Sequence, residues 1–134
     1  MVSNADVAQE VVDAFGQVRS KALRWVIAKV DDTAVVLEAT GARESTLEEL
    51  QAAVGDEPRY IVYDFEHTKD DGVHMTKTCF IAYSPDSCNN IQAKFALQNF
   101  KRSAMSKIQA HKEMQINDKA DIKIAEFLAA FNLD

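Results

Sequence analysis

Few side chains able to do catalytic chemistry stand at spacings that would let them act together. His67, His74 and His111 lack the spacing of metal ligands, although His67 and His74 flank one predicted hairpin and could approach each other. Asp70 and Asp71 in that hairpin could attract a cation, but a charged hairpin tip needs no such role. No phosphate-binding glycine motif and no Gly-x-Ser-x-Gly motif occurs. The sequence therefore predicts no enzyme, metal or cofactor, with a small-molecule enzyme built on these hairpin residues as the weakest alternative.

The segment from about Cys88 to Ile108 suggests a different activity, which is docking onto a partner. At 100° per residue, one side of this predicted helix is apolar and would pack on the core, with Ala93, Ala96, Leu97, Phe100, Ala104 and Ile108. The opposite side combines a polar stripe with large apolar groups, namely Ile91, Lys94, Phe95, Gln98, Lys101 and Met105. Apolar groups among lysines fit an apolar recess rimmed with acid. Phe95 or Ile91 could equally pack under a loop, and periodicity alone leaves both interpretations open.

The elements that must position this helix follow from hydrophobic periodicity and turn residues. Apolar runs predict strands over residues 24–30, 33–39, 59–66, 75–83 and 113–116. Helices are predicted over residues 4–20, 45–55 and 88–108, and a last helix extends to Leu133. The expected caps are Ser3 or Asn4, a Ser45–Glu48 capping box, and Asp118. This order predicts an α+β fold, a single domain over residues 1–134 with a mixed sheet of about five strands flanked by about four helices.

Composition limits the partners and the compartment. The 134 residues include 15 Lys and Arg against 21 Asp and Glu, and a net charge of -6 argues against nucleic-acid binding. Cys79 and Cys88 are too few for a disulfide framework, so we expect reduced thiols. The first residues lack the pattern of a secretory signal, and no apolar run reaches the ~18 residues of a membrane span. We expect a soluble, cytoplasmic monomer.

Two strand motifs resemble the ADF/cofilin family of actin-binding proteins. Residues 59–65 read R-Y-I-V-Y-D-F and residues 77–86 read K-T-C-F-I-A-Y-S-P-D. The corresponding family strands read R-Y-(A/I)-(I/V)-Y-D-F and K-x-x-F-I-x-W-x-P-D. Phe15, Val18 and residues 24–27 resemble the family's first helix and strand. The resemblance covers nearly the whole chain, with the elements in the same order.

This resemblance implies a five-stranded mixed sheet between helices and a protein of the actin cytoskeleton. Family members bind actin monomers and filaments, and promote depolymerisation and severing. The long helix and the N-terminal segment contact the monomer, which carries over to Ser3, Asn4, Ile91, Lys94, Phe95, Gln98, Lys101 and Met105. Ser3 matches the serine whose phosphorylation switches binding off in many relatives, because a phosphate would repel an acidic partner. Lysines on the helix could also bring competition by phosphoinositides.

Departures from the family pattern affect both expected actin contacts. Gln92 stands where a basic residue is usual, and residues 97–100 read L-Q-N-F in place of Y-A-S-S, so the affinity for monomers could differ. The last helix offers no arginine pair to a second actin subunit in a filament. The predicted filament-side residues are therefore His74, Lys77, Lys119, Lys123 and Glu126. We predict weak filament binding relative to monomer binding.

Glia maturation factor proteins provide the alternative within the same superfamily. They share the fold and a similar run, echoed by residues 58–60 and by residues 70–72 through Pro85, but they act on the Arp2/3 complex and dissociate actin branches. Residues 63–65 and 84–86, together with Ser3 and Lys94, favour the ADF/cofilin type. Binding to monomeric actin would distinguish the two.

Overall fold

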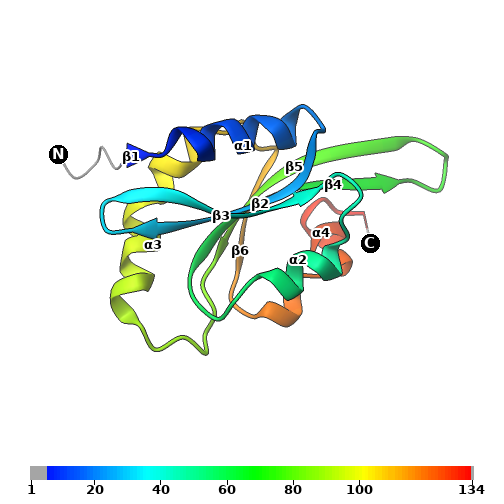
Figure 1. Cartoon of the computed structure of the whole chain (residues 1–134). Coiled ribbons are helices and arrows are strands. Elements are labelled where there is room, and N and C mark those ends of the chain that lie inside the picture. The colour runs from blue at the N-terminus through cyan, green and yellow to red at the C-terminus, as the bar shows by residue number, and fades with distance from the viewer. Residues whose placement is uncertain (1–5, 134) are drawn as a thin grey trace.

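The computed structural model describes residues 6–133 and contains one mixed sheet with the strand order β1-β3-β2-β4-β5-β6 (Figure 1). The five expected strands and four expected helices are present, which confirms the α+β fold, and β1 adds a two-residue strand at one edge. The strands are β1 Asp6–Val7, β2 Leu23–Asp31, β3 Ala34–Ala42, β4 Arg59–Thr68, β5 His74–Tyr83 and β6 Lys112–Ile116. The helices are α1 Gln9–Arg19, α2 Leu47–Ala53, α3 Ile91–Met105, the short 3-10 helix η1 Lys119–Asp121 and α4 Ile124–Ala130.

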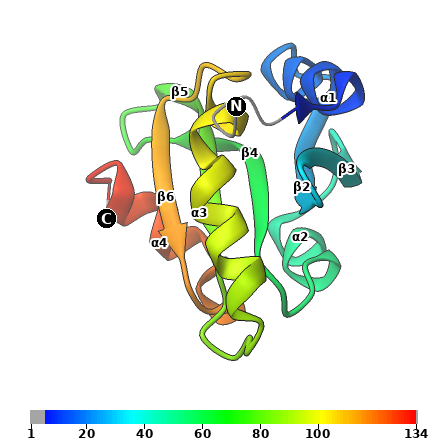
Figure 2. The same ribbon diagram turned by 90° about the vertical axis from the view of Figure 1, so that its left-hand side faces the viewer.

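Helices cover both faces of the sheet. The side chains of α1 and α3 share one apolar core with β2, β4 and β5, and those of α2 and α4 share the other. Along β5 the expected alternation is confirmed, because Cys79 and Ile81 enter the core under α2 and α4 while Phe80 enters the core under α1 and α3. Residues 60–65 of β4 are buried in succession because this strand is covered on both faces. Figure 2 shows α3 in front of the sheet, with β6 beside it.

The first two helices begin later than expected. α1 starts at Gln9 after Ala8, which provides no side-chain cap, and Ser3 and Asn4 lie outside the described residues. α2 has a capping box, but it joins Thr46 and Glu49. The predicted Ser45–Glu48 box is wrong because the Ser45 hydroxyl instead accepts a hydrogen bond of 3.0 Å from the indole N–H of Trp25.

The last two helices are also shorter than predicted. α3 runs from Ile91 to Met105, with the Asn90 side chain accepting a hydrogen bond from the amide of Ala93, so Cys88 precedes the helix. Asp118 caps η1 and not the last helix, which starts after Lys123. No helix among residues 6–133 combines the length and apolarity needed to cross a membrane.

Candidate functional site

The core side of α3 holds the helix firmly against the sheet. Leu97 and Ala104 are buried, and Phe100 packs against the core shared with α1. The hydroxyl of the buried Tyr60 on β4 donates a hydrogen bond of 2.5 Å to the carbonyl of Leu97. This hydrogen bond and the apolar packing fix the position and rotation of α3, so its outer side is presented in one orientation.

Two large apolar side chains stand on the outer side of α3. Ile91 and Phe95 are each 64% exposed, one helical turn apart, at the positions where i and i+4 residues share a face. Neither packs under a loop, so the loop-packing interpretation is wrong for both side chains, while docking onto a partner stays a prediction. Large exposed apolar groups on one helix face mark candidate docking sites. We call Ile91, Lys94, Phe95, Gln98 and Lys101 the α3 surface.

Met105 differs from the sequence-based expectation. Its side chain is half-buried and packs against the core shared by α1 and α3, alongside Phe100 and Ile108. The prediction that it faces outward with Lys94 was therefore wrong. The flexible, unbranched thioether fills the space at the end of the helix, where the chain turns toward residues 106–111. Gln98, by contrast, is exposed as expected.

The two lysines of the α3 surface have different surroundings. Lys94 is half-buried and forms no ion pair with any side chain between residues 7 and 133. The ammonium of Lys101 lies 2.8 Å from a carboxylate oxygen of Glu113 on β6. Among the described side chains, the polar stripe predicted from periodicity thus contains one lysine without an ionic partner and one that is paired with a carboxylate.

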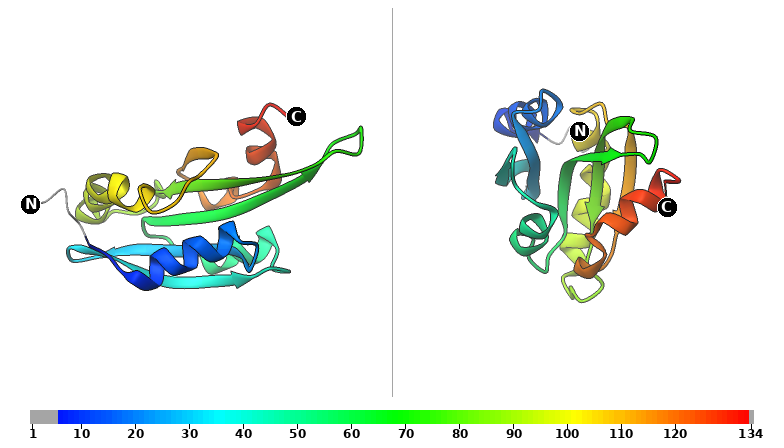
Figure 3. Two further views of the ribbon diagram at one scale, coloured as in Figure 1. Left: turned by 90° about the horizontal axis from the view of Figure 1, so that it is seen from above. Right: turned by 90° about the vertical axis from the view of Figure 1, so that its right-hand side faces the viewer.

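The residues predicted to contact filaments are spread over several elements. Lys77 is half-buried on β5, and His74 lies 3.0 Å from the hydroxyl of Thr68. Lys119 in η1 lies 3.4 Å from Asp56, whereas Lys123 is exposed at the start of α4. Glu126 on α4 is half-buried. Figures 1 and 3 show that α4 and the β4–β5 hairpin lie at the end of the molecule opposite α3, so the two predicted surfaces are separate.

A buried ionic network was missed in the sequence. Asp64 on β4 is fully buried, and its carboxylate lies 2.9 Å from Lys21 and 2.8 Å from Arg43. Arg43 and Arg24 also pair with Glu66 two residues along the strand. The network ties the α1–β2 turn and the end of β3 to the central strand. Its one signal in the sequence was a carboxylate inside a continuous apolar run.

Two of the groups with shifted pKa values are a buried thiol and a partly buried histidine. Burial raises the pKa of the Cys79 thiol to about 12, so it stays protonated and unreactive. Partial burial, and then the positive charges of Lys77, Arg19 and Lys21, lower the pKa of His111. A hollow beside the β4–β5 hairpin is lined by residues that include His67, Asp70 and Asp71. No trio of histidine, cysteine or acidic side chains within the described part of the chain is placed to hold a metal ion.

Comparison with known proteins identifies relatives over nearly the whole chain. Residues 4–132 match the sequence model of a family described as cofilin/tropomyosin-type actin-binding protein. Actin-depolymerizing factor 2 of Oryza sativa subsp. japonica is 31% identical over 127 residues, covering 91% of this chain and 87% of that protein. An actin-depolymerizing factor of Vitis vinifera is 34% identical over 110 residues, covering 79% of this chain and 76% of that protein.

Solved structures share the fold. A cofilin of Streptomyces griseoflavus superposes with a TM-score of 0.81 at 20% identity, covering 92% of this chain and 96% of that chain. Plasmodium berghei actin depolymerization factor 2 gives 0.81 at 23% identity, covering 99% of each chain. The glia maturation factor of Caenorhabditis elegans gives 0.75 at 14% identity, covering 93% of this chain and 94% of that chain. The fold alone therefore does not separate the ADF/cofilin type from the glia maturation factor type.

Proposed function

This chain is a member of the cofilin/tropomyosin-type actin-binding protein family, and we propose that it binds actin monomers through the α3 surface and the N-terminal segment. Binding of this kind would promote filament depolymerisation and severing. The observation that carries the proposal is the pair Ile91 and Phe95, each 64% exposed on a helix that the core holds in place. Ser3 and Asn4, which we propose as the N-terminal contacts, lie outside the described residues.

The chemistry of the α3 surface suits an apolar recess with an acidic rim. Complete burial of a side chain such as phenylalanine contributes about 1.5–3 kcal/mol, so Phe95 can act as an anchor. Lys94, which has no ionic partner among the described residues, can pair with a partner carboxylate without losing an existing contact. Gln98 adds a hydrogen-bonding group on the same side. We assign Met105 a supporting role, because its half-buried side chain shapes the end of the surface.

An Arp2/3-directed role of the glia maturation factor type receives less support. The two sequence relatives described above are actin-depolymerizing factors at 31% and 34% identity, whereas the glia maturation factor structure is 14% identical. We propose the ADF/cofilin activity on this basis, in a monomeric, non-enzymatic protein of the cytoplasmic actin cytoskeleton. Phosphorylation of Ser3 and competition by phosphoinositides at the α3 surface are proposed as its regulation.

Changes of Phe95→Ala and Lys94→Ala test the proposed site directly. We expect Phe95→Ala to weaken binding to fluorescently labelled monomeric actin about 10- to 100-fold, and Lys94→Ala about 3- to 10-fold, because an anchor is lost in the first and a charge in the second. Circular dichroism would confirm that both variants are folded, since both side chains lie outside the buried core.

Two matched variants control for the type of change. Val73→Ala removes a 54%-exposed apolar side chain from the β4–β5 hairpin, and Lys123→Ala removes an exposed lysine from the start of α4. Both should bind monomers as the unmodified protein does. Unchanged affinity in the Phe95 and Lys94 variants would contradict the site. If the unmodified protein does not bind monomeric actin, a branch-dissociation assay with the Arp2/3 complex tests the alternative.

A further inference from the structure

Among the acidic side chains that the structure describes, Glu113 is the one that forms an ion pair with the α3 surface. On β6, Met114 and Ile116 pack into the core under α2 and α4, so strand alternation turns Glu113 toward α3. The register agrees, because Glu113 lies opposite Phe80, whose side chain enters the core under α3. From this position the Glu113 carboxylate contacts the Lys101 ammonium at 2.8 Å, with side-chain exposures of 42% and 27%.

The ion pair with Glu113 distinguishes Lys101 from Lys94, the other lysine of the α3 surface. Lys94 and Lys101 are separated by seven residues, or about two turns, and share one side of α3. A carboxylate on a partner can approach Lys94 with no competing ion pair from the side chains that the structure describes. At Lys101, the same carboxylate must first displace Glu113 or share the lysine with it. Because the pair remains partly exposed to water, that displacement is feasible.

We propose that Glu113 is an intramolecular competitor, which occupies Lys101 in the free protein and thereby limits the affinity of the α3 surface for an acidic partner. The proposal rests on the proposed function, because it concerns the same surface and assigns the partner carboxylates at its rim. It adds a residue of β6, a strand with no predicted contact, to the determinants of binding. Exposed ion pairs of this kind correspond to about a two- to five-fold change in an equilibrium constant.

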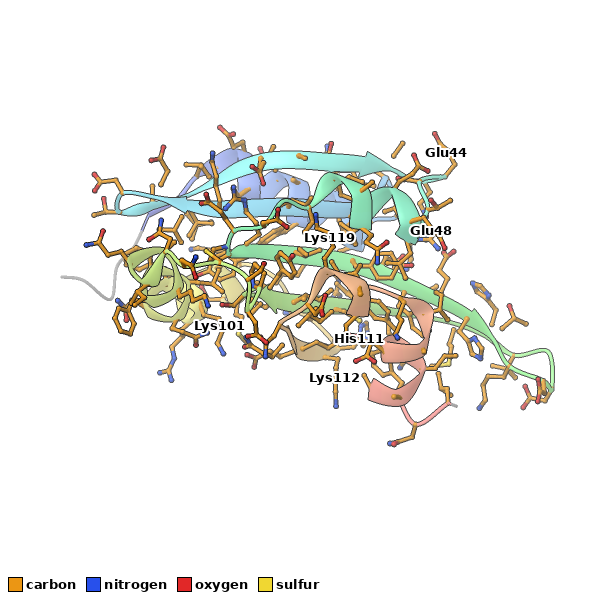
Figure 4. All side chains as sticks on the ribbon, turned by 90° about the horizontal axis from the view of Figure 1, so that it is seen from below. Glu44, Glu48, Lys101, His111, Lys112 and Lys119 are labelled. Carbon is orange, nitrogen blue, oxygen red and sulfur yellow. The ribbon has the colours of Figure 1, made fainter. Side chains whose placement is uncertain are left out.

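The variant Glu113→Gln removes the competing charge and keeps the shape of the side chain. We expect it to bind labelled monomeric actin about two- to five-fold more tightly than the unmodified protein at low salt, with the gain shrinking as salt screens the charges. Glu44→Gln is the matched control because it makes the same change in net charge at an exposed residue that forms no ion pair with any side chain from residue 7 to residue 133. Figure 4 shows Glu44 near α2 and Lys101 on α3, well apart from each other.

A double-mutant cycle with Lys101→Ala separates competition from direct repulsion. If Glu113 acts by occupying Lys101, the gain from Glu113→Gln must disappear when Lys101 is alanine. A gain that persists in the Lys101→Ala background would show that Glu113 repels the partner directly, and would overturn the proposal. No gain beyond that of Glu44→Gln would overturn it as well.

A second readout does not depend on actin. In the free protein, amine labelling followed by mass spectrometry should modify Lys101 faster in Glu113→Gln, while labelling of Lys94 stays the same. An unchanged rate at Lys101 would mean that the pair does not occupy the lysine in solution, which overturns the proposal. If actin binding responds to Phe95→Ala but not to Glu113→Gln, the competitor role alone fails. If binding does not respond to Phe95→Ala, the proposed function fails and this inference fails with it.

Discussion

Trp25 lies directly on Gly41 in the core under α2. A Cβ atom added at Gly41 would stand 2.2 Å from Cε2 of the indole ring, a distance that no packed structure allows. The indole N–H donates to Ser45 just before α2, so the ring also joins β2 to the start of that helix. Glycine is required at position 41 because the neighbouring ring occupies the space of a side chain.

Substitution of Gly41 by alanine should therefore destabilise the protein. We expect Gly41→Ala to lower the free energy of unfolding by about 1–3 kcal/mol, because the indole must move out of a packed core. Urea denaturation followed by Trp25 fluorescence measures the change. Gly16→Ala is the matched control, since a Cβ there meets nothing within 4 Å in the exposed side of α1. That variant should be as stable as the original or up to about 1 kcal/mol more stable. Equal stability of the two variants would contradict the argument.

His111, just before β6, adds two hydrogen bonds to the pairing of that strand with β5. The amide of Thr78 donates to Nδ1 of His111 at 2.9 Å, and the amide of His111 donates to the carbonyl of Thr78 at 2.7 Å. A proton on Nδ1 would abolish the first of these hydrogen bonds. Partial burial and the nearby positive charges of Lys77, Arg19 and Lys21 lower the pKa of His111, and the negative charge of Asp64 partly opposes them. The folded protein thus favours the neutral imidazole.

Stability should accordingly decrease as the solution becomes acidic. The unfolded chain binds a proton at His111 near pH 6.5, above the pKa of the folded state, so the contribution is complete above about pH 6.5 and is lost below it. We expect the urea midpoint to fall between pH 7.5 and pH 5.5, and to fall less in His111→Gln. His74→Gln, which changes a histidine on β5 that is not bonded to Thr78, serves as the control. An identical pH dependence with and without His111 would exclude this mechanism.

At the scale of the whole molecule, the two predicted actin contacts are separated by the length of the sheet. α3 lies at one end, while the β4–β5 hairpin and α4 project at the other (Figures 1 and 3). Lys77 and α4 lie on the same face of the sheet. Lys77 is the register partner of Phe65 across β4 and β5, and the Phe65 ring stacks on that of Phe127 in α4, with 5.4 Å between the ring centroids. If both proposed contacts exist, this separation predicts that each can be altered without changing the other.

The double variant Lys77→Ala/Lys123→Ala should reduce filament binding alone. We expect about a 3- to 10-fold loss in co-sedimentation with filaments, because two charges are removed, and monomer affinity within about two-fold of the original. The unmodified protein should itself decorate filaments weakly relative to its affinity for monomers. Lys119→Ala is a useful comparison, since its ammonium is already close to Asp56 and its loss should matter less. Strong stoichiometric decoration of filaments would refute the prediction of weak filament binding.

Elements and family motifs could be predicted from the sequence because they depend on residues close together in the chain. Alternation in residues 75–83 identified β5 and its two faces, and the period of the long helix separated Leu97 and Ala104 from Phe95. The motifs over residues 59–65 and 77–86 indicated the family that the comparison confirmed. Local patterns of this kind encode the propensity and burial of each element.

Tertiary structure decided the features that depend on distant residues. The indole N–H of Trp25 donates a hydrogen bond to the Ser45 hydroxyl, and the capping box of α2 is formed by Thr46 and Glu49 instead. The Met105 side chain packs against the core and does not lie on the outer side of α3. Glu113 on β6 forms an ion pair with Lys101 on α3. Periodicity reports which side of a helix is apolar, but it carries no information about the charge that a neighbouring strand brings to that side. The sequence had already placed Ile91 and Phe95 on the outer side of α3, but the difference between the two lysines became visible only once α3 and β6 were placed together.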